Sequence, residues 1–449
     1  MYQSGGTARR HSTPRPGTEH FALTTSRISL GRAHLLAASL IREATRAGIP
    51  PTSLNRVGSL RRFAPDIGDA ALLAGISTAH HPDVLARFAT LPMVTGVLDR
   101  TASMASVTTT KGRATLYVVP PDQVGAGLVW HTGSQRHTEQ LQRRAERLGM
   151  TFVDGHLRRG GVLLSAPKEE DLYRYLELPV IPAELREGCD EIEVADRGAM
   201  PGLVSTEVIR GDLHMHTTWS DGRDTLEMMV YASKSLGYEY VAITDHSERA
   251  WSSRKLSTSD VSRQREEIEA VRRHLQGIDV LHGVEVDIMK DGTLDFPDEV
   301  LEGFDIVLAS LHDHGGQSGE ELTSRYLQAI DHPLVNVITH PANRSPAVAP
   351  GYDLDFDRLF AAAAATGTAL EIDGAPGHLD MDGSVARRAA AAGVTVTIDS
   401  DSHRAEALSR QMRFGVGTAR RGWVEPRHVL NTRPVIDVRA FVAAKRARR

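Results

Sequence analysis

The sequence predicts an α/β protein whose C-terminal half folds as a β/α barrel. Three observations carry this prediction: short apolar runs alternate with segments of helical length, seven strand-led units follow one another, and the units end in side chains that can bind a metal. Such alternation is typical of a parallel sheet, and in a barrel the C-terminal ends of all strands meet at one face. We therefore expect one site built from several strand ends.

The first unit is the stretch 211–222, which reads GDLHMHTTWSDG. His214 and His216 are two residues apart on an extended segment, so both imidazoles face one side, and Asp221 follows in the next loop. A single pair of histidines is weak evidence, but the pattern recurs. The later runs, each with its candidate ligands, are 241–244 with Asp245 and His246, 278–281 with His282 and Glu285, 306–309 with His312, 335–338 with His340, 369–370 with Glu371 and Asp373, and 394–397 with Asp401 and His403.

Helical segments separate most of these runs. They are rich in Ala, Leu, Glu and Arg, and we expect them at 225–236, 261–275, 320–330, 356–365 and 384–392. Nearer the N-terminus, residues 1–25 are rich in Ser, Thr, Gly, Pro and Arg and predict a disordered leader, whereas apolar periodicity from Ile28 to Ile49 predicts a helix.

Composition limits the class of protein. A chain of 449 residues, 41% hydrophobic and 24% charged, is long enough for two or three domains with cores of their own. No apolar run reaches the roughly 18 residues that a membrane span needs, and no secretory signal precedes the first helix. With Cys189 as the single cysteine, we expect a cytoplasmic protein without a membrane partner and without an internal disulfide.

Charge is distributed unevenly along the chain. Residues 1–150 hold 18 Lys and Arg against 9 Asp and Glu, a balance of +9, whereas residues 151–449 hold 34 against 48, a balance of −14. A basic region is the usual footprint of a partner with a phosphate backbone, which favours DNA. An ordinary solvated basic surface remains the alternative.

The C-terminal half resembles the polymerase and histidinol phosphatase (PHP) domain, in particular the copy found at the C-terminus of bacterial family X DNA polymerases. The resemblance rests on GDLHMHTTWSDG, AITDHS, GVEVDI, VLASLH, THPANR, LEIDG and SDSHR. It implies a distorted (β/α)7 barrel with two or three divalent ions, Mn, Zn or Fe. The implied ligands, which are also the implied catalytic residues, are His214, His216, Asp221, His246, Glu285, His312, His340, Asp401 and His403. Asp373 departs from that family's more frequent Asn, which leaves its role open.

A second resemblance, to the palm of the same polymerases, covers residues 56–75 and 113–121. Those enzymes hold two magnesium ions with three aspartates on adjacent strands. Gly58, Ser59 and the first aspartate, Asp69, are present, but Ala71 and Thr115 occupy the positions of the other two. Because most of the carboxylate charge is missing, we expect no polymerase activity.

The stretch from His131 to Met150 resembles the nucleotide-facing thumb, with Thr132, Gly133 and Ser134 retained as implied substrate contacts. The expected organisation is a leader (1–25), a small α+β nucleotidyltransferase-like palm and thumb remnant (26–187), a linker (188–206) and a PHP phosphoesterase domain (207–449).

The function that follows is metal-dependent hydrolysis of phosphoesters. By resemblance the substrate is a DNA 3′ end, giving a 3′-5′ exonuclease or 3′-phosphatase. Two alternatives stay open: a phosphatase of small phosphoesters, as in the histidinol phosphatase branch, and a non-catalytic DNA-repair binding module. Arg344 is a candidate for binding the substrate phosphate or, equally, for a structural ion pair.

Overall fold

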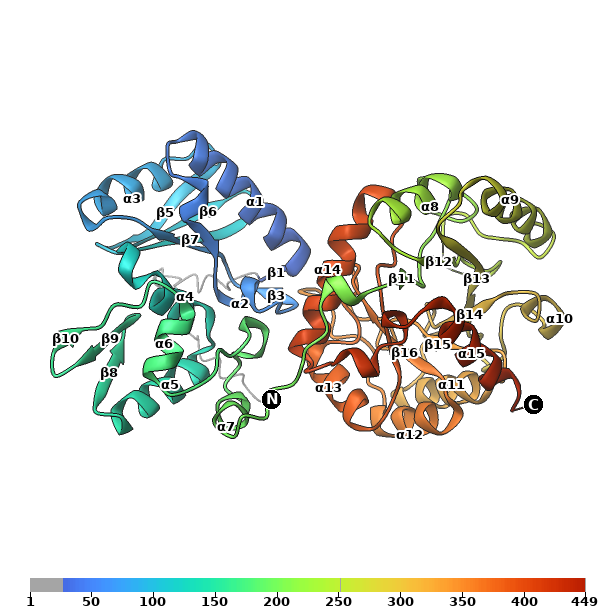
Figure 1. The fold of residues 1–449 in the computed structure, drawn as a ribbon. Helices are drawn as coiled ribbons and strands as arrows, with labels where there is room; N and C mark the ends of the chain where they lie inside the picture. The colour runs from blue at the N-terminus through green and yellow to red at the C-terminus, as the bar shows by residue number, and fades with distance from the viewer. Residues whose placement is uncertain (1–26, 251, 449) are drawn as a thin grey trace, which may run out of the picture.

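The computed structural model describes residues 27–250 and 252–448, which form two halves lying side by side (Figure 1). The expected leader, residues 1–25, lies outside the described residues. The C-terminal half is a barrel of parallel strands surrounded by helices, and the N-terminal half consists of two smaller α+β lobes. The predicted α/β class is therefore confirmed.

Seven parallel strands form the barrel and pair in chain order. A parallel bridge between Met215 and Ser402 brings the last strand back to the first, so the barrel is nearly closed. Its elements are β11 (Gly211–Asp212), α8 (Leu226–Ser235), β12 (Tyr240–Ile243), α9 (Val261–His274), β13 (Asp279–Asp287), α10 (Asp298–Leu301), β14 (Ile306–Ser310), α11 (Gly319–Asp331), β15 (Val337–Ile338), α12 (Phe356–Thr366), β16 (Ala369–Asp373), α13 (Gly383–Ala391), β17 (Val396–Asp399), α14 (Leu408–Arg421) and α15 (Val435–Arg446).

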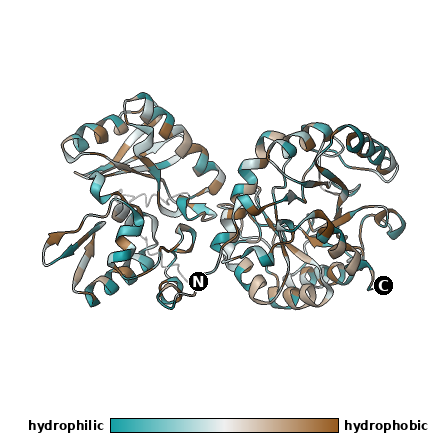
Figure 2. Ribbon diagram, in the orientation of Figure 1, coloured by the Kyte–Doolittle hydropathy of each residue, from teal (hydrophilic) through white to brown (hydrophobic). Residues whose placement is uncertain are grey.

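Side chains alternate between the inside and the outside of this barrel. Outward residues such as Val241 and Val284 pack in the large apolar core beneath the helices. Inward residues such as Tyr240 and Leu281 form a second core, which Val438 of α15 joins. Figure 2 shows the mostly hydrophilic α9 outside the hydrophobic strands. The apolar inward layer lies near the strand starts, which leaves the strand ends free for polar side chains.

One strand differs from the expectation. β13 extends to Asp287, whereas the apolar run that predicted it ends at Leu281. The extra length pairs with β14, with Glu285 opposite Leu308. Glu285 therefore lies on a strand in the barrel wall rather than in a loop.

The first N-terminal lobe is built on a five-stranded sheet in the order β2-β4-β7-β6-β5. Strands β4 and β7 run parallel at its centre, and α1 supplies much of the apolar cover. The elements are β1 (Ile28–Ser29), α1 (Leu30–Arg46), β2 (Leu54–Arg56), α2 (Gly58–Arg61), β3 (Asp66–Ile67), β4 (Ala70–Gly75), α3 (His81–Ala89), β5 (Val94–Arg100), β6 (Met104–Thr109) and β7 (Gly112–Val119).

The second lobe packs helices against a small antiparallel sheet. Its elements are α4 (Val124–Thr132), α5 (Gln135–Arg147), β8 (Met150–Val153), β9 (His156–Arg159), β10 (Val162–Leu163), α6 (Glu169–Tyr175) and α7 (Glu191–Asp196). The last of these lies in the expected linker, residues 188–206. Glu191 Oε1 is 2.7 Å from His137 Nδ1, and both side chains are fully buried, so the start of this stretch belongs to the lobe's packed interior.

Helix α14 forms the boundary between the two halves (Figure 1). Phe414 on this helix shares an apolar cluster with the core of the first lobe. Glu187 accepts hydrogen bonds from Arg62 of the first lobe and from Arg421 of α14, so one carboxylate links both halves. Among the described residues, no helix combines the length and the hydrophobicity that crossing a membrane requires.

Candidate metal centre

The nine expected ligands converge at one end of the barrel and form three groups around Glu285. In the first group, the Nε2 atoms of His214 and His216 lie 3.1 Å apart, and each is 3.6 Å from Glu285 Oε2. Asp401 Oδ1 completes this group at 3.1 Å from His216 Nε2. The four side chains come from the segment after β11, from β13 and from the loop after β17.

The second group uses the other oxygen of Glu285. His340 Nε2 lies 2.9 Å and His312 Nε2 lies 3.7 Å from Glu285 Oε1. His312 follows β14, which pairs with β13, and His340 follows β15, the next strand along the barrel. Glu285 can therefore serve two neighbouring sites with its two oxygens.

The third group lies beside the first. Asp221 Oδ1 is 3.2 Å from His403 Nε2 and 3.5 Å from His246 Nε2. The ring of His246 also stacks on that of His216 at a centroid distance of 4.2 Å, which joins the third group to the first. All nine residues thus belong to one continuous cluster.

The arrangement fits divalent cations. Glu285 Oε2 and His246 Nδ1 are 2.7 Å apart, yet neither atom, nor Asp221 Oδ1, has a hydrogen-bond partner among the described residues. Buried polar atoms without partners are costly, and a cation at their common focus would satisfy them. Imidazole and carboxylate donors in groups of three or four are the usual ligands of Zn, Mn and Fe.

The electrostatics of the cluster also favour the binding of cations. Burial lowers the pKa of His216 to about 3, and the charges of His246 and His403 act in the same direction, so this imidazole is neutral as a ligand must be. Burial by itself would raise the pKa of Glu285, but the surrounding histidines hold it well below its usual value. The cluster therefore offers an ionised carboxylate in a largely buried setting, where a cation is bound strongly.

Glu371 positions two of the ligands. Its Oε1 lies 2.6 Å from His214 Nδ1, and its Oε2 accepts the backbone N–H of His340 at 2.8 Å. Because Nδ1 is engaged with Glu371, Nε2 is the nitrogen of His214 that faces His216 and Glu285. Glu371 was a candidate ligand from its place at a strand end, and in the structure it lies behind the ligands.

Asp245 orients the loop that carries Asp221. Its Oδ1 accepts the backbone N–H groups of Thr217 and Ser220 at 2.8 and 3.0 Å. The loop then folds back tightly at Gly222, where a Cβ would lie 2.5 Å from the carbonyl oxygen of His216. A side chain at this position would push Asp221 away from the histidines.

Two ligands occupy strained backbone conformations. His340 has a φ of 23° and Asp401 a φ of 46°, in the left-handed region that residues other than glycine seldom adopt. Such strain costs on the order of 1–3 kcal/mol and persists where the surroundings enforce it. Both residues come directly after a strand, so the conformation turns their side chains back to the focus.

Behind the ligands lie two buried acids that the sequence did not single out. Asp212 accepts the backbone N–H of Ser400 at 3.1 Å, and Asp399 accepts that of Leu213 at 2.8 Å. Burial and the charge of Asp399 raise the pKa of Asp212 to about 7. These bonds tie the first and last strands together directly beneath the candidate ligands. In the sequence, the position of Asp212 two residues before His214 was the signal that could have indicated this acid.

His282 does not join the cluster, although it was a candidate. It lies on the outward side of β13, where its Nε2 is 2.9 Å from Gln264 Oε1. Its distance of three residues from Glu285 places the two side chains on opposite faces of the strand. Arg344 is mostly buried and donates to Asp382 Oδ2 at 3.1 Å, so the ion pair is present.

In the first lobe, the positions expected to carry metal-binding carboxylates lie side by side. Ala71 on β4 is the register partner of Thr115 on β7, and Asp69 precedes β4. The Thr115 hydroxyl donates to Ser106 Oγ at 3.2 Å, and burial raises the pKa of Asp69. A lone carboxylate is a poor binder of two magnesium ions.

The expected substrate contacts lie on both lobes, and several of them already have partners within the protein. Gly58 begins α2 close to Ala71, and Ser59 follows it on the same helix. Thr132 is fully buried and accepts from Arg61, and Ser134 caps α5 by accepting the N–H of His137. Gly133 stands between them at the end of α4.

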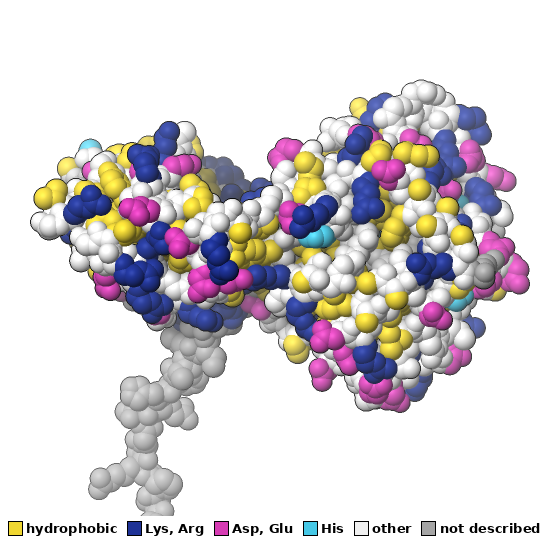
Figure 3. Space-filling view, turned by 60° about the horizontal axis from the view of Figure 1, so that its bottom comes forward, with side chains coloured by type: hydrophobic (Ala, Val, Ile, Leu, Met, Phe, Trp, Pro, Cys, Tyr) yellow, Lys and Arg dark blue, Asp and Glu magenta, His cyan; other side chains and the backbone are white. Residues whose placement is uncertain are grey.

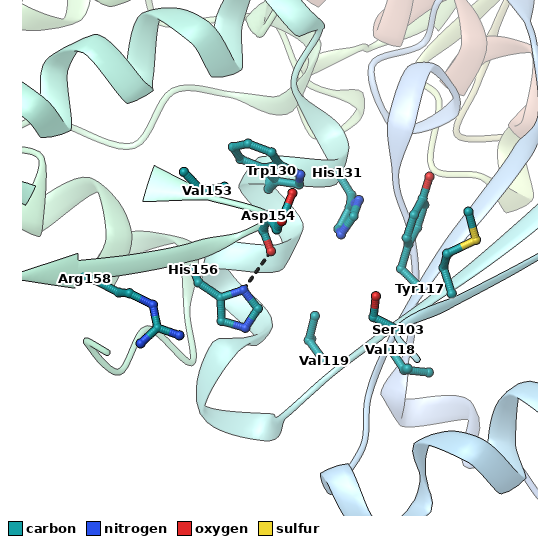
Figure 4. A pocket seen from close by; sticks show the side chains of 11 residues that line it. Ser103, Tyr117, Val118, Val119, Trp130, His131, Val153, Asp154, His156 and Arg158 are labelled. Atoms are coloured by element: carbon teal, nitrogen blue, oxygen red, sulfur yellow. Dashed lines mark hydrogen bonds between the residues drawn. The ribbon is translucent and has the colours of Figure 1, made fainter. Parts of the chain in front are cut away.

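A cavity of about 540 Å³ opens between the two lobes (Figure 4). His131 stacks on Tyr117 at a centroid distance of 3.8 Å on one side, and Trp130 lines it as well. Arg158 and His156 project from β9 on the opposite side, which gives the cavity both aromatic and basic walls.

Comparison with known proteins agrees with this architecture. A family model described as PHP domain matches residues 212–339, and one described as DNA polymerase beta thumb matches residues 127–187. The DNA polymerase/3'-5' exonuclease PolX of Bacillus subtilis (strain 168) is 34% identical over 393 residues, which span 86% of this chain and 68% of that protein. The chain belongs to the PolX family.

Shorter relatives match as well. A probable phosphatase of Syntrophotalea carbinolica is 30% identical over 217 residues, covering 46% of this chain and 85% of that protein. A probable phosphatase of Thermoanaerobacter sp. (strain X514) is 29% identical over 203 residues, or 43% of this chain and 78% of that protein. The resemblance read from the sequence is thus confirmed for both halves of this PolX family member. The PHP match ends at residue 339, and the structure places His340, Asp401 and His403 against the earlier candidate ligands.

Proposed function

We propose that the chain is a metal-dependent phosphoesterase that hydrolyses phosphoesters at DNA 3′ ends and does not transfer nucleotides. The observation that carries the proposal is the convergence of nine ligands on Glu285, whose two oxygens face separate groups. The proposed ligands and catalytic residues are these nine. Three groups of ligands accommodate two or three ions of Mn, Zn or Fe.

Ions held there would supply Lewis acidity that activates water and neutralises charge on the phosphoryl oxygens. The protein's own contribution is to fix the ligands. Glu371 holds His214 by a hydrogen bond, Asp245 holds the loop that carries Asp221, and the apolar layer below excludes water from the barrel interior. Rigid placement of this kind keeps attacking and leaving groups aligned.

DNA as the substrate is supported by the rest of the molecule. The basic balance lies in the first 150 residues, and on the face drawn in Figure 3 Lys and Arg side chains gather on the N-terminal half near its boundary with the barrel. The cavity between the lobes adds Trp130 and Arg158, side chains suited to a nucleobase and a phosphate. The PolX relative is named as a 3'-5' exonuclease.

A phosphatase of small phosphoesters is the second candidate, because the shorter relatives are named probable phosphatases. A panel assay decides between the two. The full chain is freed of metal, reloaded with Mn²⁺, Zn²⁺ or Mg²⁺, and given a 3′-hydroxyl DNA strand, a 3′-phosphate DNA strand and small phosphomonoesters.

We expect release of nucleotides or phosphate from DNA at the highest kcat/KM. Preference for a small phosphoester would favour the second candidate. DNA binding without turnover on any substrate or metal would overturn both and leave the binding-module alternative. Any extension of a primer would contradict the second half of the proposal.

A further inference from the structure

A fourth group of metal-binding side chains adjoins the cluster. Asp373 ends β16, His378 lies in the loop that follows, and both converge with Asp401 so that one ligand atom from each lies within 4.8 Å of the others. Two of these residues, Asp373 and His378, are outside the nine ligands proposed above. Asp401 would be shared with the first group, as Glu285 is shared between the first and second.

The carboxylate of Asp373 is buried without a hydrogen-bond partner for each of its oxygens. Its side chain is fully buried, and while Oδ1 accepts the N–H of Ala375 at 2.5 Å, Oδ2 has no hydrogen-bond partner among the described residues. The carboxylate that converges with it, that of Asp401, carries the same charge. A buried carboxylate in this position requires either a proton or a cation.

His378 supplies the matching donor. Its ring stacks on that of His340 at a centroid distance of 4.9 Å and an interplanar angle of 19°, which holds it beside the second group. The Nδ1 atom is buried and also lacks a hydrogen-bond partner among the described residues. An imidazole nitrogen and two carboxylates form a ligand set that Zn, Mn and Fe accept.

We propose that Asp373, His378 and Asp401 bind a further divalent cation next to the ions of the main cluster. Three protein ligands leave coordination positions open, so this ion would hold a phosphoryl oxygen of the substrate at the edge of the site. His378 is only half buried, and exposed Gly377 precedes it, which leaves this group a side open to solvent. The inference rests on the proposed function, because it adds an ion to that site.

The test counts ions in the full chain. The wild type, Asp373→Asn and His378→Gln are stripped with a chelator, reloaded with excess Mn²⁺ or Zn²⁺, desalted, and analysed by native mass spectrometry and elemental analysis. We expect each variant to hold one ion fewer than the wild type while the remaining ions bind unchanged. The exposed residues His314 and Asp353, as His314→Gln and Asp353→Asn, serve as matched controls and should keep the full number.

A thermal measurement adds a readout that is independent of turnover. Asn in place of Asp373 keeps an acceptor for the N–H of Ala375 and removes the buried charge. We therefore expect metal-free Asp373→Asn to unfold at a higher temperature than the metal-free wild type, and to gain less from added metal. Equal ion numbers in the wild type and both variants would overturn the inference and leave a protonated Asp373, with the proposed function intact. A wild type that binds no metal would overturn both.

Discussion

At the scale of the residue, Glu285 is the centre of the site. It is fully buried on a barrel strand, its Oε2 faces His214, His216 and His246, and its Oε1 faces His312 and His340. Any cation in the first or second group would contact it. A change at this residue therefore affects more than one ion.

We expect Glu285→Gln to lose more than one ion per chain and to lower kcat on phosphoesters by on the order of a hundredfold or more, because the amide cannot bridge two cations. Metal analysis and single-turnover kinetics measure the two effects. The exposed Glu266→Gln on α9 is the matched control. Full metal content in Glu285→Gln would contradict the bridging role.

Glu371 is expected to behave differently, because it acts through His214 and the backbone of His340. Glu371→Gln should lower metal affinity ~10- to 100-fold, the usual effect of removing a partner behind a ligand. The number of ions at saturation should stay unchanged, and added metal should restore kcat. Titration of the metal-free protein with Zn²⁺ or Mn²⁺ checks this. A permanent loss of an ion would instead make Glu371 a ligand.

At the scale of the element, the pair β4 and β7 keeps the expected positions of the polymerase carboxylates side by side. Ala71 and Thr115 remain register neighbours, so the strands keep the geometry that would hold two more carboxylates beside Asp69. Both side chains are buried, as core residues of a sheet are. The backbone is retained, and the charge that would bind magnesium is absent.

We expect the double substitution Ala71→Asp and Thr115→Asp to create a magnesium site but no polymerase. Three adjacent carboxylates repel one another, so the variant should unfold several degrees below the wild type without metal and recover with Mg²⁺. Thermal unfolding with and without Mg²⁺ measures this. Adding Asp69→Ala should remove the Mg²⁺ effect. Primer extension by the double variant should stay undetectable, since the Thr132 hydroxyl, an expected substrate contact, remains bonded to Arg61.

At the scale of the whole molecule, the two halves share a boundary but the barrel has its own core. That core includes Val204, whose N–H donates to the carbonyl of Val424, and Arg420 donates to the carbonyl of Val204. A fragment designed to isolate the barrel should therefore begin near residue 201 rather than 207. Removing the N-terminal half exposes Phe414, which otherwise packs against it.

We expect a fragment of residues 201–449 to retain kcat on small phosphoesters within a fewfold, although it unfolds at a lower temperature. Its action on DNA should weaken, and its salt dependence should become shallower, because the basic half that we propose to contact phosphates is missing. Rates at several salt concentrations for the fragment and the full chain test this. Equal DNA degradation by both at every salt concentration would show that the N-terminal half does not recruit DNA.

Local patterns in the sequence were sufficient to predict the seven β/α units and eight of the nine candidate ligands at their ends. The reason is that strand periodicity and the parallel topology together place the inward residues at the strand ends on one face. His282 lies an odd number of residues from Glu285 on β13, so the alternation of side chains along a strand places it on the opposite face, away from the cluster. The motif also placed Asp221, although it lies in a loop. Tertiary structure alone decided how Glu285 divides its oxygens, that Glu371 contacts His214 Nδ1 and the backbone of His340, and that Asp373 meets His378. Those outcomes depend on backbone turns at His340 and Asp401 and on contacts between strands distant in the chain, which no local pattern of residues encodes.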